Sequence, residues 1–204
     1  MPVAPKLGLR DAQKNLTFNR LVDAAAELLN ERGAFTITMD DVAKAAGVSR
    51  ATVYSHFQSK SEITEAIAQR LYDDGSEVYG FLGNQPRWTR DSLRWWMHDV
   101  ERRYREHIGY IGALSNAGPA SHMRASTVDT HSHYVDLMLS SDDQRWGDLP
   151  VAEIRQRCLI FVLHVESFCV AFTFGEFSGD ARTDPTELLL SALCHLLGPA
   201  LADY

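Results

Sequence analysis

The sequence predicts an all-α protein, with an N-terminal three-helix segment followed by a longer helical segment. Apolar residues recur at steps of three and four through most of the chain, the spacing that places them on one face of an α-helix. No stretch shows the strict alternation of apolar and polar residues that indicates a half-buried β-strand. At 204 residues and 45% hydrophobic, the chain is long enough to bury a substantial core.

The first expected helix covers residues 15–32 and follows a flexible arm over residues 1–14. Gly33 stands where a helix commonly ends in a left-handed C-cap. The apolar positions of this helix are Phe18, Leu21, Val22, Ala25, Leu28 and Leu29. They form one stripe, so the helix should be amphipathic and pack by that stripe.

Two short helices follow, and both carry capping signals. Thr38 and Asp41 have the spacing of a capping box at the start of the second helix. Gly47 supplies the turn that ends it, and Ser49 is a good N-cap for the third helix because its hydroxyl can accept from a free backbone N–H. The apolar face of the second helix is Met39, Val42, Ala43 and Ala46. Residues 15–60 therefore predict a helix-turn-helix domain.

Residues 61–204 are expected to form a second helical domain. Ser59 and Glu62 repeat the capping-box spacing and open a helix that runs to about residue 82. Apolar periodicity then marks helices over about 93–111, 121–139 and 151–177. The final helix begins with Asp184 as its cap and Pro185 at its first position.

Charge and cysteine content limit the classes of protein. The net charge is -7, which argues against a non-specific coat on nucleic acid. Residues 1–60 hold eight Lys and Arg against six Asp and Glu, a balance of +2 that leaves -9 for residues 61–204. Cys158, Cys169 and Cys194 lie in apolar helical patterns and should be reduced, buried thiols. We found no signal peptide and no uninterrupted membrane span, so a cytoplasmic protein without a membrane partner is expected.

The third helix presents a small polar face away from its apolar anchors. On a wheel of 100° per residue, Val53 and Phe57 point inward. Small outward side chains allow a helix to approach base edges in a major groove about 12 Å wide. The outward positions are Ala51, Thr52, Tyr54 and Ser55. A plain helical hairpin with a polar outer face is the alternative interpretation of the same periodicity.

On the DNA-binding interpretation, the side chains divide into two roles. Arg50 can reach a guanine edge or a phosphate, and Tyr54, His56 and Lys60 can donate to phosphates. Thr38, at the start of the preceding helix, offers a further phosphate site. The residues expected to contact DNA are Thr38, Ser49, Arg50, Ala51, Thr52, Tyr54, Ser55, His56 and Lys60.

The order of these features favours DNA binding. The segment TITMDDVAKAAGVSRATVYSHFQSKSEITEAI resembles the DNA-binding domain of the TetR family of bacterial transcriptional regulators, and the resemblance covers about residues 15–65. The matching positions are Gly33, Thr38, Val42, Ala43, Ala46, Gly47, Val48, Ser49, Val53, Tyr54, His56, Phe57, Lys60 and Ile63. Ala51 and Val53 stand where members often have glycine and leucine or isoleucine, which bears on the operator that is read.

The resemblance implies a homodimer that binds a roughly palindromic double-stranded operator. Residues 61–204 would then be a regulatory, effector-binding and dimerisation domain. An apolar or aromatic small-molecule effector would release a repressor by moving the helix from Ser61, because the two reading helices must stay about 34 Å apart. A regulator controlled by a protein partner is the alternative. No catalytic motif occurs, so neither an enzyme nor a cofactor is expected, although an unexpected reaction in the C-terminal pocket stays open.

The candidate effector pocket draws on aromatic and polar residues of the C-terminal half. Trp95 and Trp96 are adjacent and cannot share one narrow stripe, so one must face something besides the core. The candidate residues are Trp95, Trp96, Tyr104, His107, Tyr134, Phe161, His164 and Phe168, with core packing as the competing interpretation for each. Glu166 can also orient a ligand. His131 and His133 point about 160° apart on a helix and predict a solvated face, not a metal site.

The dimer contact is expected on the last two long helices. Its candidate residues are Ile154, Val165, Leu189, Leu193 and Leu196. A monomer core needs residues of the same kind at the same spacing, so periodicity alone does not separate the two roles.

Overall fold

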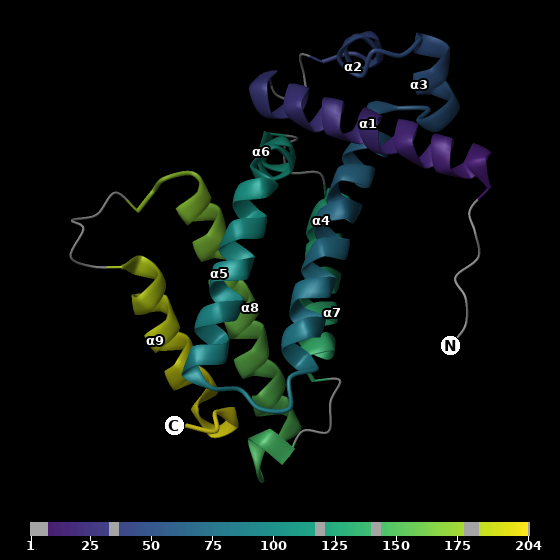
Figure 1. Ribbon diagram of the computed structural model, residues 1–204. Coiled ribbons are helices and arrows are strands. Elements are labelled where there is room, and N and C mark those ends of the chain that lie inside the picture. Colours follow the sequence, from purple (N-terminus) through teal and green to yellow (C-terminus); the bar gives the residue numbers. More distant parts are fainter. Residues whose placement is uncertain (1–7, 33–36, 117–120, 140–143, 178–183, 204) are drawn as a thin grey trace. The chain divides into compact units, whose positions relative to one another are not determined.

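A computed structural model describes residues 8–32, 37–116, 121–139, 144–177 and 184–203. Within those residues the regular secondary structure is helical (Figure 1), which confirms the all-α prediction. The helices are α1 (Leu9–Arg32), α2 (Met39–Ala45), α3 (Arg50–His56), α4 (Lys60–Gly83), α5 (Arg90–Glu106), α6 (Ile108–Asn116), α7 (Ser121–Met138), α8 (Val151–Thr173) and α9 (Pro185–Leu197), with short 3-10 helices at Gln144–Trp146 and Gly198–Ala200.

The chain divides into two compact units. Unit 1 comprises Met1–Leu71 and Gly109–Gly118, and unit 2 comprises Tyr72–Ile108 and Pro119–Tyr204. The boundary therefore differs from the expected division at residue 60. The first half of α4 belongs to unit 1, and so does nearly all of α6, a segment far away in the sequence.

The core of unit 1 is built from α1 to α4 and one residue of α6. Apolar faces of α2 and α3 meet the stripe of α1, and Ala113 of α6 is completely buried among them. The fully or almost fully buried side chains include Leu21, Val22, Val42, Val53, Phe57, Ile63 and Ile67. The predicted apolar face of α2 is confirmed, because Met39, Val42, Ala43 and Ala46 are all buried.

Local capping is where the sequence was most informative. The Thr38 hydroxyl accepts from the N–H of Asp41, and the Asp41 carboxylate accepts from the N–H of Thr38, which is the predicted capping box. Ser49 caps α3 by accepting from the N–H of Thr52 at 3.0 Å. Gly47 has φ of 61° in the turn between these helices, a conformation that a Cβ disfavours.

The N-terminal prediction needs a correction. Helix α1 begins at Leu9, so residues 9–14, expected in a flexible arm, are helical. Residues 1–7 and the predicted C-cap at Gly33 lie outside the described residues. Periodicity missed the start of α1 because Leu9 and Leu16 are exposed, so the first two turns have no continuous apolar stripe.

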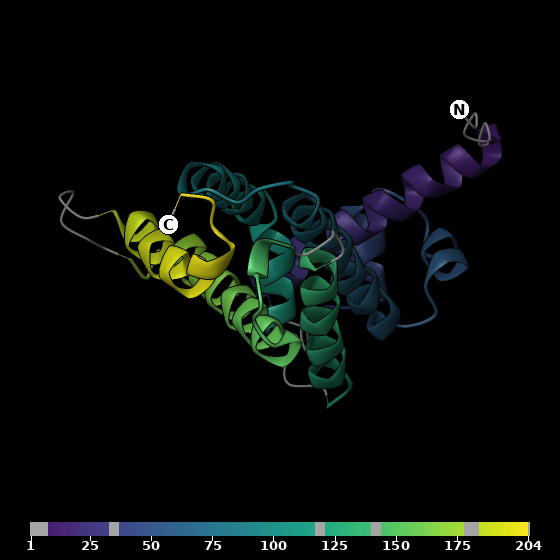
Figure 2. The same ribbon diagram turned by 90° about the horizontal axis from the view of Figure 1, so that it is seen from below.

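Helix α8 is the central helix of unit 2. It packs against α5, α7 and α9, and Figures 1 and 2 both show these helices beside it. Phe161, Val162 and Val165 of α8 are fully buried. By length and composition α8 is apolar enough to cross a membrane, but the core helix of a soluble protein meets the same criteria. The three cysteines are buried free thiols, as predicted.

The region expected as one helix over about 93–111 is two helices. Helix α5 ends at Glu106 and α6 begins at Ile108, with His107 as the C-cap between them. Of the apolar residues expected beyond the break, Ile108 is 41% exposed and Ile111 is buried. The spacing of apolar residues indicates a helical face but does not show where one helix ends and the next begins, so the break at His107 could not be predicted from it.

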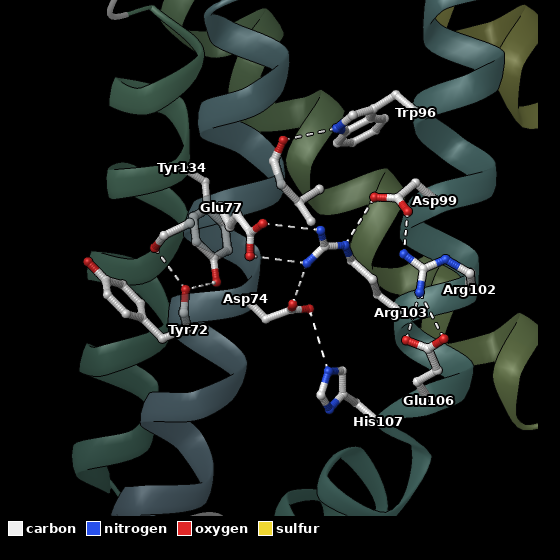
Figure 3. A network of polar contacts seen from close by, with 12 residues as sticks. Tyr72, Asp74, Glu77, Trp96, Asp99, Arg102, Arg103, Glu106, His107 and Tyr134 are labelled. Atoms are coloured by element: carbon white, nitrogen blue, oxygen red, sulfur yellow. Dashed lines mark hydrogen bonds and ion pairs between the residues drawn. The ribbon is translucent and has the colours of Figure 1, made fainter. Parts of the chain in front are cut away.

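An arginine joins α5 to α4 in unit 2 (Figure 3). The guanidinium of Arg103 donates to Asp74 at 2.6 Å and to Asp99 at 3.0 Å, and it lies 3.4 Å from Glu77. Because Arg103 is only 20% exposed, this network is shielded more than a surface ion pair and should contribute more. On another side of α4, a Cβ on Gly83 would lie 2.0 Å from the carbonyl oxygen of Leu137, so the glycine allows α4 to approach α7.

A half-buried ion pair connects α7 to α8. His131 Nε2 lies 2.8 Å from Glu166 Oε2, and the two side chains are 16% and 25% exposed. The hydrogen bond to Glu166 raises the pKa of His131, against the opposing effect of its burial. This placement corrects the prediction that His131 lies on a solvated face.

The raised pKa predicts a pH-dependent contribution to stability. A histidine whose pKa is higher in the folded state stabilises fully below its unfolded value of about 6.5, and the contribution is lost as pH rises through the folded value. We expect His131→Gln to lower the free energy of unfolding by about 1 kcal/mol more at pH 5.5 than at pH 8.5. Denaturant titrations at both values measure this difference.

The partner provides the control. Glu166→Gln should reproduce the pH dependence, and the double variant should add little to either single change, as a double-mutant cycle tests. A loss of stability that is equal at the two pH values would show that the pair does not act through its charge.

Candidate nucleic-acid interface

Helix α3 is anchored by two side chains and open on its other face. Val53 is completely buried and Phe57, at the C-cap, is 3% exposed. Tyr54 is 43% exposed, and Ala51 and Ser55 are exposed beside it. The orientation expected from the helical wheel is therefore correct. An open face with small side chains suits close approach to a flat or grooved surface.

The hydroxyl groups of α3 are held by bonds within the helix. Ser49 Oγ lies 2.8 Å from Thr52 Oγ1, and Ser55 Oγ donates to the carbonyl oxygen of Thr52 at 2.7 Å. Thr52 is partly buried. A hydroxyl that donates one bond keeps lone pairs free to accept another, so Ser55 offers an acceptor at a fixed position.

Arg50 begins α3 and is held between two neighbours. Its Nη1 donates to Asp40 Oδ2 at 3.3 Å, and its Nε lies 3.1 Å from Asp40 Oδ1. Its guanidinium also lies over the ring of Tyr54, 5.5 Å from the centroid. The Tyr54 hydroxyl and then the Asp40 carboxylate raise the pKa of Arg50. The arginine therefore stays charged and has a preferred position on the open face.

Two other candidate residues also have structural roles. Lys60 Nζ donates to the carbonyl oxygen of Ile37 at 3.0 Å, which ties the start of α4 to the segment before α2. The ring of His56 is 6.3 Å from that of Phe18, and burial, with the charge of Lys14, lowers the pKa of His56. His56 is therefore a neutral imidazole, which can still donate one N–H.

The N-terminus of α2 gives no support to the expected phosphate site at Thr38. The Thr38 hydroxyl bonds to Asp41, and Asp40 and Asp41 both lie in the first turn. These carboxylates complement the positive end of the helix dipole themselves. A phosphate brought to Thr38 would meet two negative charges.

The candidate effector residues separate into a core and a surface group. Trp95 is 60% exposed on α5, and His164 is exposed on α8, where Nδ1 contacts the carbonyl oxygen of Ile160. These two lie outside the interior of unit 2, and Trp95 instead lines an outer groove. The others, Trp96, Tyr104, His107, Tyr134, Phe161 and Phe168, are buried or half-buried in it.

Within that interior, three tyrosines are affected by the charge of one carboxylate, Glu166. Tyr79 stacks on Tyr134 at 4.7 Å, and the Tyr79 hydroxyl has no hydrogen-bond partner among the described residues. Burial, and then the charge of Glu166, raises the pKa of Tyr79, Tyr104 and Tyr134. These phenols are therefore neutral donors near an anion. Sequence reasoning missed Tyr79, although its spacing of seven from Tyr72 puts both on one face of α4.

The outer aromatic residues form a separate small groove in unit 2. Trp95 and Phe81 lie with their ring centroids 5.5 Å apart. The half-open groove beside them has a volume of about 210 Å³ and is lined by Phe81, Leu82, Gln85, Ser92, Trp95 and Trp96. Trp96 itself is in the core, where its Nε1 donates to the carbonyl oxygen of Val78. The expectation that one of the two tryptophans faces away from the core is confirmed.

Most of the residues proposed for dimer contact belong to the core of unit 2. Ile154, Val165 and Leu193 are buried in the core of unit 2, and Leu189 and Leu196 are partly buried against it. The first three are therefore unavailable to a partner. The exposed apolar residues of α8 and α9 are instead Val151, Leu159, Ile160, Leu163 and Leu188. A helix hydrophobic nearly all round has two apolar faces, and periodicity does not say which one the chain itself covers.

No group of three His, Cys, Asp or Glu side chains that could hold a metal ion occurs in the described part of the chain.

Residues 21–67 match the family model described as bacterial regulatory proteins, tetR family. That stretch covers α2, α3 and most of the core of unit 1. The family match therefore falls on the open helix and on the residues that anchor it.

Two relatives each match part of the chain. The negative transcriptional regulator IcaR of the icaADBC biofilm operon of Staphylococcus aureus is 29% identical over 90 residues, 42% of this chain and 48% of the relative. The transcriptional regulator AlkX of Mycobacterium tuberculosis is 38% identical over 73 residues, 35% of each chain. The chain thus spans about half or less of the length of these relatives.

Solved structures extend the likeness to most of the chain. A TetR-family transcriptional regulator from Streptomyces coelicolor has a TM-score of 0.62 at 23% identity, covering 90% of this chain and 81% of its own. NalD of Pseudomonas aeruginosa, the secondary repressor of the MexAB-OprM multidrug efflux pump, has a TM-score of 0.62 at 16% identity, covering 95% and 100%. These likenesses concern the fold. Together with the family match over residues 21–67, they show a TetR-like fold whose N-terminal helix-turn-helix is of the tetR family type.

Proposed function

We propose that the protein is a sequence-specific DNA-binding transcriptional regulator that acts as a repressor in the cytoplasm. The observation that carries the proposal is the anchoring of α3: Val53 and Phe57 are buried, and the opposite face is open. That face lies inside the segment that matches the family model. The repressor role is supported by IcaR and NalD, whose names describe a negative regulator and a repressor.

The open face of α3 supports two kinds of DNA contact, one to base edges and one to phosphates. Ala51, Thr52 and Ser55 are small enough to meet base edges, where thymine methyl groups and hydrogen-bonding atoms distinguish the base pairs. Tyr54 and Lys60 contact phosphates, which set the register of the protein on the duplex without reading sequence. Selection of binding sites from random double-stranded DNA tests the proposal, and failure to enrich any site would contradict it.

These two kinds of contact predict two kinds of loss. Tyr54→Phe and Lys60→Ala should weaken binding to all sequences alike, and Lys60→Ala should reduce the slope of log K against log salt by about one per protomer. Thr52→Val should change the preference at one base pair by a free energy of about 1–3 kcal/mol. Fluorescence anisotropy with the selected site and its single-base variants measures both effects.

Two controls accompany these variants. Thermal unfolding of Lys60→Ala is needed because its ammonium also bonds to Ile37. Arg87→Ala removes a positive charge from an exposed position of unit 2 and should leave the preference unchanged. If Tyr54→Phe, Lys60→Ala and Thr52→Val all lowered the affinity for every sequence by the same factor, the proposed separation of base and phosphate contacts would be contradicted.

We further propose that the protein is a homodimer through the exposed apolar face of α8 and α9. Leu159, Ile160 and Leu163 are 38% to 41% exposed on α8, and Leu188 is 62% exposed on α9. Contiguous apolar residues at a surface support an interaction site, because scattered ones are normal and clustered ones are not. Two recognition helices about 34 Å apart would then meet successive turns of the major groove.

A charge in this face should prevent assembly. Leu163→Asp is expected to shift the sedimenting species from two chains to one and to weaken operator binding by at least about 100-fold, since each half-site is then bound separately. Analytical ultracentrifugation at micromolar concentration measures the first effect. Val128→Asp is the matched control, because Val128 is 66% exposed on α7. A single chain already present in the wild type would refute the dimer.

The effector is proposed to be an apolar or aromatic small molecule that binds in the interior of unit 2. Stacked tyrosine rings provide aromatic surface, and the Tyr79 hydroxyl can donate to a ligand because it has no partner among the described residues. Sites of this kind combine apolar walls with a few oriented polar groups. The alternative, control by a protein partner, is supported by the exposed Phe81 and Trp95 pair.

A ligand panel tests the effector proposal. A ligand of this kind should quench the fluorescence of the buried tryptophan Trp96, which lies 5.5 Å from Tyr79, and should lower operator affinity. Tyr79→Phe should lower the affinity for the ligand by about tenfold, which corresponds to the loss of one hydrogen bond, and should leave operator binding unchanged. If the Trp95→Phe variant no longer shows the quenching, the ligand binds in the outer groove instead.

A further inference from the structure

The contact between Asp40 and Arg50 bears on how the proposed DNA-binding function selects its sequence. Asp40 is the second residue of α2, and Arg50 is the first residue of α3. The guanidinium meets the carboxylate through two nitrogens, at 3.1 and 3.3 Å. Both side chains are more than half exposed, so the pair lies on the surface and both residues are accessible to a duplex.

Asp40 is held in place by its own helix. Met39 and Val42 on either side of it are buried in the core of unit 1, and the capping box at Thr38 fixes the first turn of α2. Arg50 has a second restraint, because its guanidinium lies 5.5 Å from the ring centroid of Tyr54. The arginine therefore lies between a carboxylate of one helix and an aromatic ring of the next.

The restraint on Arg50 affects whether its guanidinium contacts a base or a phosphate. Phosphates are present at every sequence, so an unrestrained arginine on the flank gains binding energy without discrimination. An arginine has five N–H donors in a planar fork, and the two nitrogens that face Asp40 leave others free. A carboxylate beside the fork also repels phosphate at that position.

We propose that Asp40 is a positioning residue that determines specificity: it holds Arg50 toward a base edge and keeps it from the phosphate backbone. The inference rests on the proposed function. The base edge that suits a held guanidinium is guanine, whose O6 and N7 accept two parallel bonds. Asp40 makes no contact with DNA itself and acts through Arg50.

Asp40→Asn tests the inference, because asparagine keeps the size of the side chain and removes its charge. Binding is measured to the selected site and to variants in which each guanine is replaced in turn. In the wild type, replacement of the guanine read by Arg50 should weaken binding by about 10- to 100-fold. In Asp40→Asn this ratio should fall to within about threefold, and the salt slope should steepen by about one per protomer as Arg50 moves to phosphate.

Three controls separate positioning from other effects. Glu27→Gln removes an exposed carboxylate of α1 and should change neither the ratio nor the slope. Asp40→Glu keeps the charge and should retain most of the discrimination. In an Arg50→Ala background, Asp40→Asn should have no further effect on the ratio, because the residue it acts through is gone.

The outcomes distinguish the inference from the function on which it rests. If the wild type selects no site, the proposed function fails. If it selects one and Asp40→Asn leaves every ratio unchanged, the function stands and the inference is overturned. The inference is also overturned if Asp40→Asn steepens the salt slope equally in the Arg50→Ala background, because Asp40 would then act by direct repulsion of phosphate.

Discussion

The burial of Val53 and Phe57 is the constraint on which the candidate interface depends. Helix α3 has seven residues, well below the roughly 12–15 that an isolated helix needs to be even marginally stable in water. It is stabilised because Val53 and the C-cap residue Phe57 are in the core of unit 1, each contributing about 1.5–3 kcal/mol. The same contacts determine which residues face outward, so the face proposed to meet DNA is determined from inside the domain.

That core is not contiguous in the sequence. Ala113 of α6 is buried in it, and Arg70 of α4 donates to Asp23 of α1 at 2.6 Å and lies over the ring of Tyr110 of α6 at 5.4 Å. Unit 1 therefore contains a segment that the chain reaches only after α5 of unit 2. The packing of α6 therefore contributes to the core that supports the helix-turn-helix.

The sequence was reliable where structure is local and ambiguous where a choice of face is involved. The caps at Thr38 and Ser49 depend on residues within three positions of each other, so they could be predicted and are confirmed. The dimer residues and the effector residues depend on which side of a helix the rest of the chain covers. Ile154 and Leu163 are equally apolar residues of α8, but the first is buried and the second is exposed. The position of Tyr79 beside Tyr134, and its response to the charge of Glu166, could not be predicted because those residues come from α7 and α8.

The distribution of charge favours a protein that reads bases over one that grips phosphates. The net charge is -7, and arginines of unit 2 such as Arg94 and Arg103 are paired with Glu187 and Asp74 inside that unit. Because the net charge of the chain is negative, the electrostatic, sequence-independent part of binding should be modest. What α3 has instead is a set of polar groups already held in place, with Ser49, Thr52 and Ser55 bonded within the helix. Groups that are ordered before binding lose less entropy when they meet a base edge, and that gain is available only at sequences whose edges match.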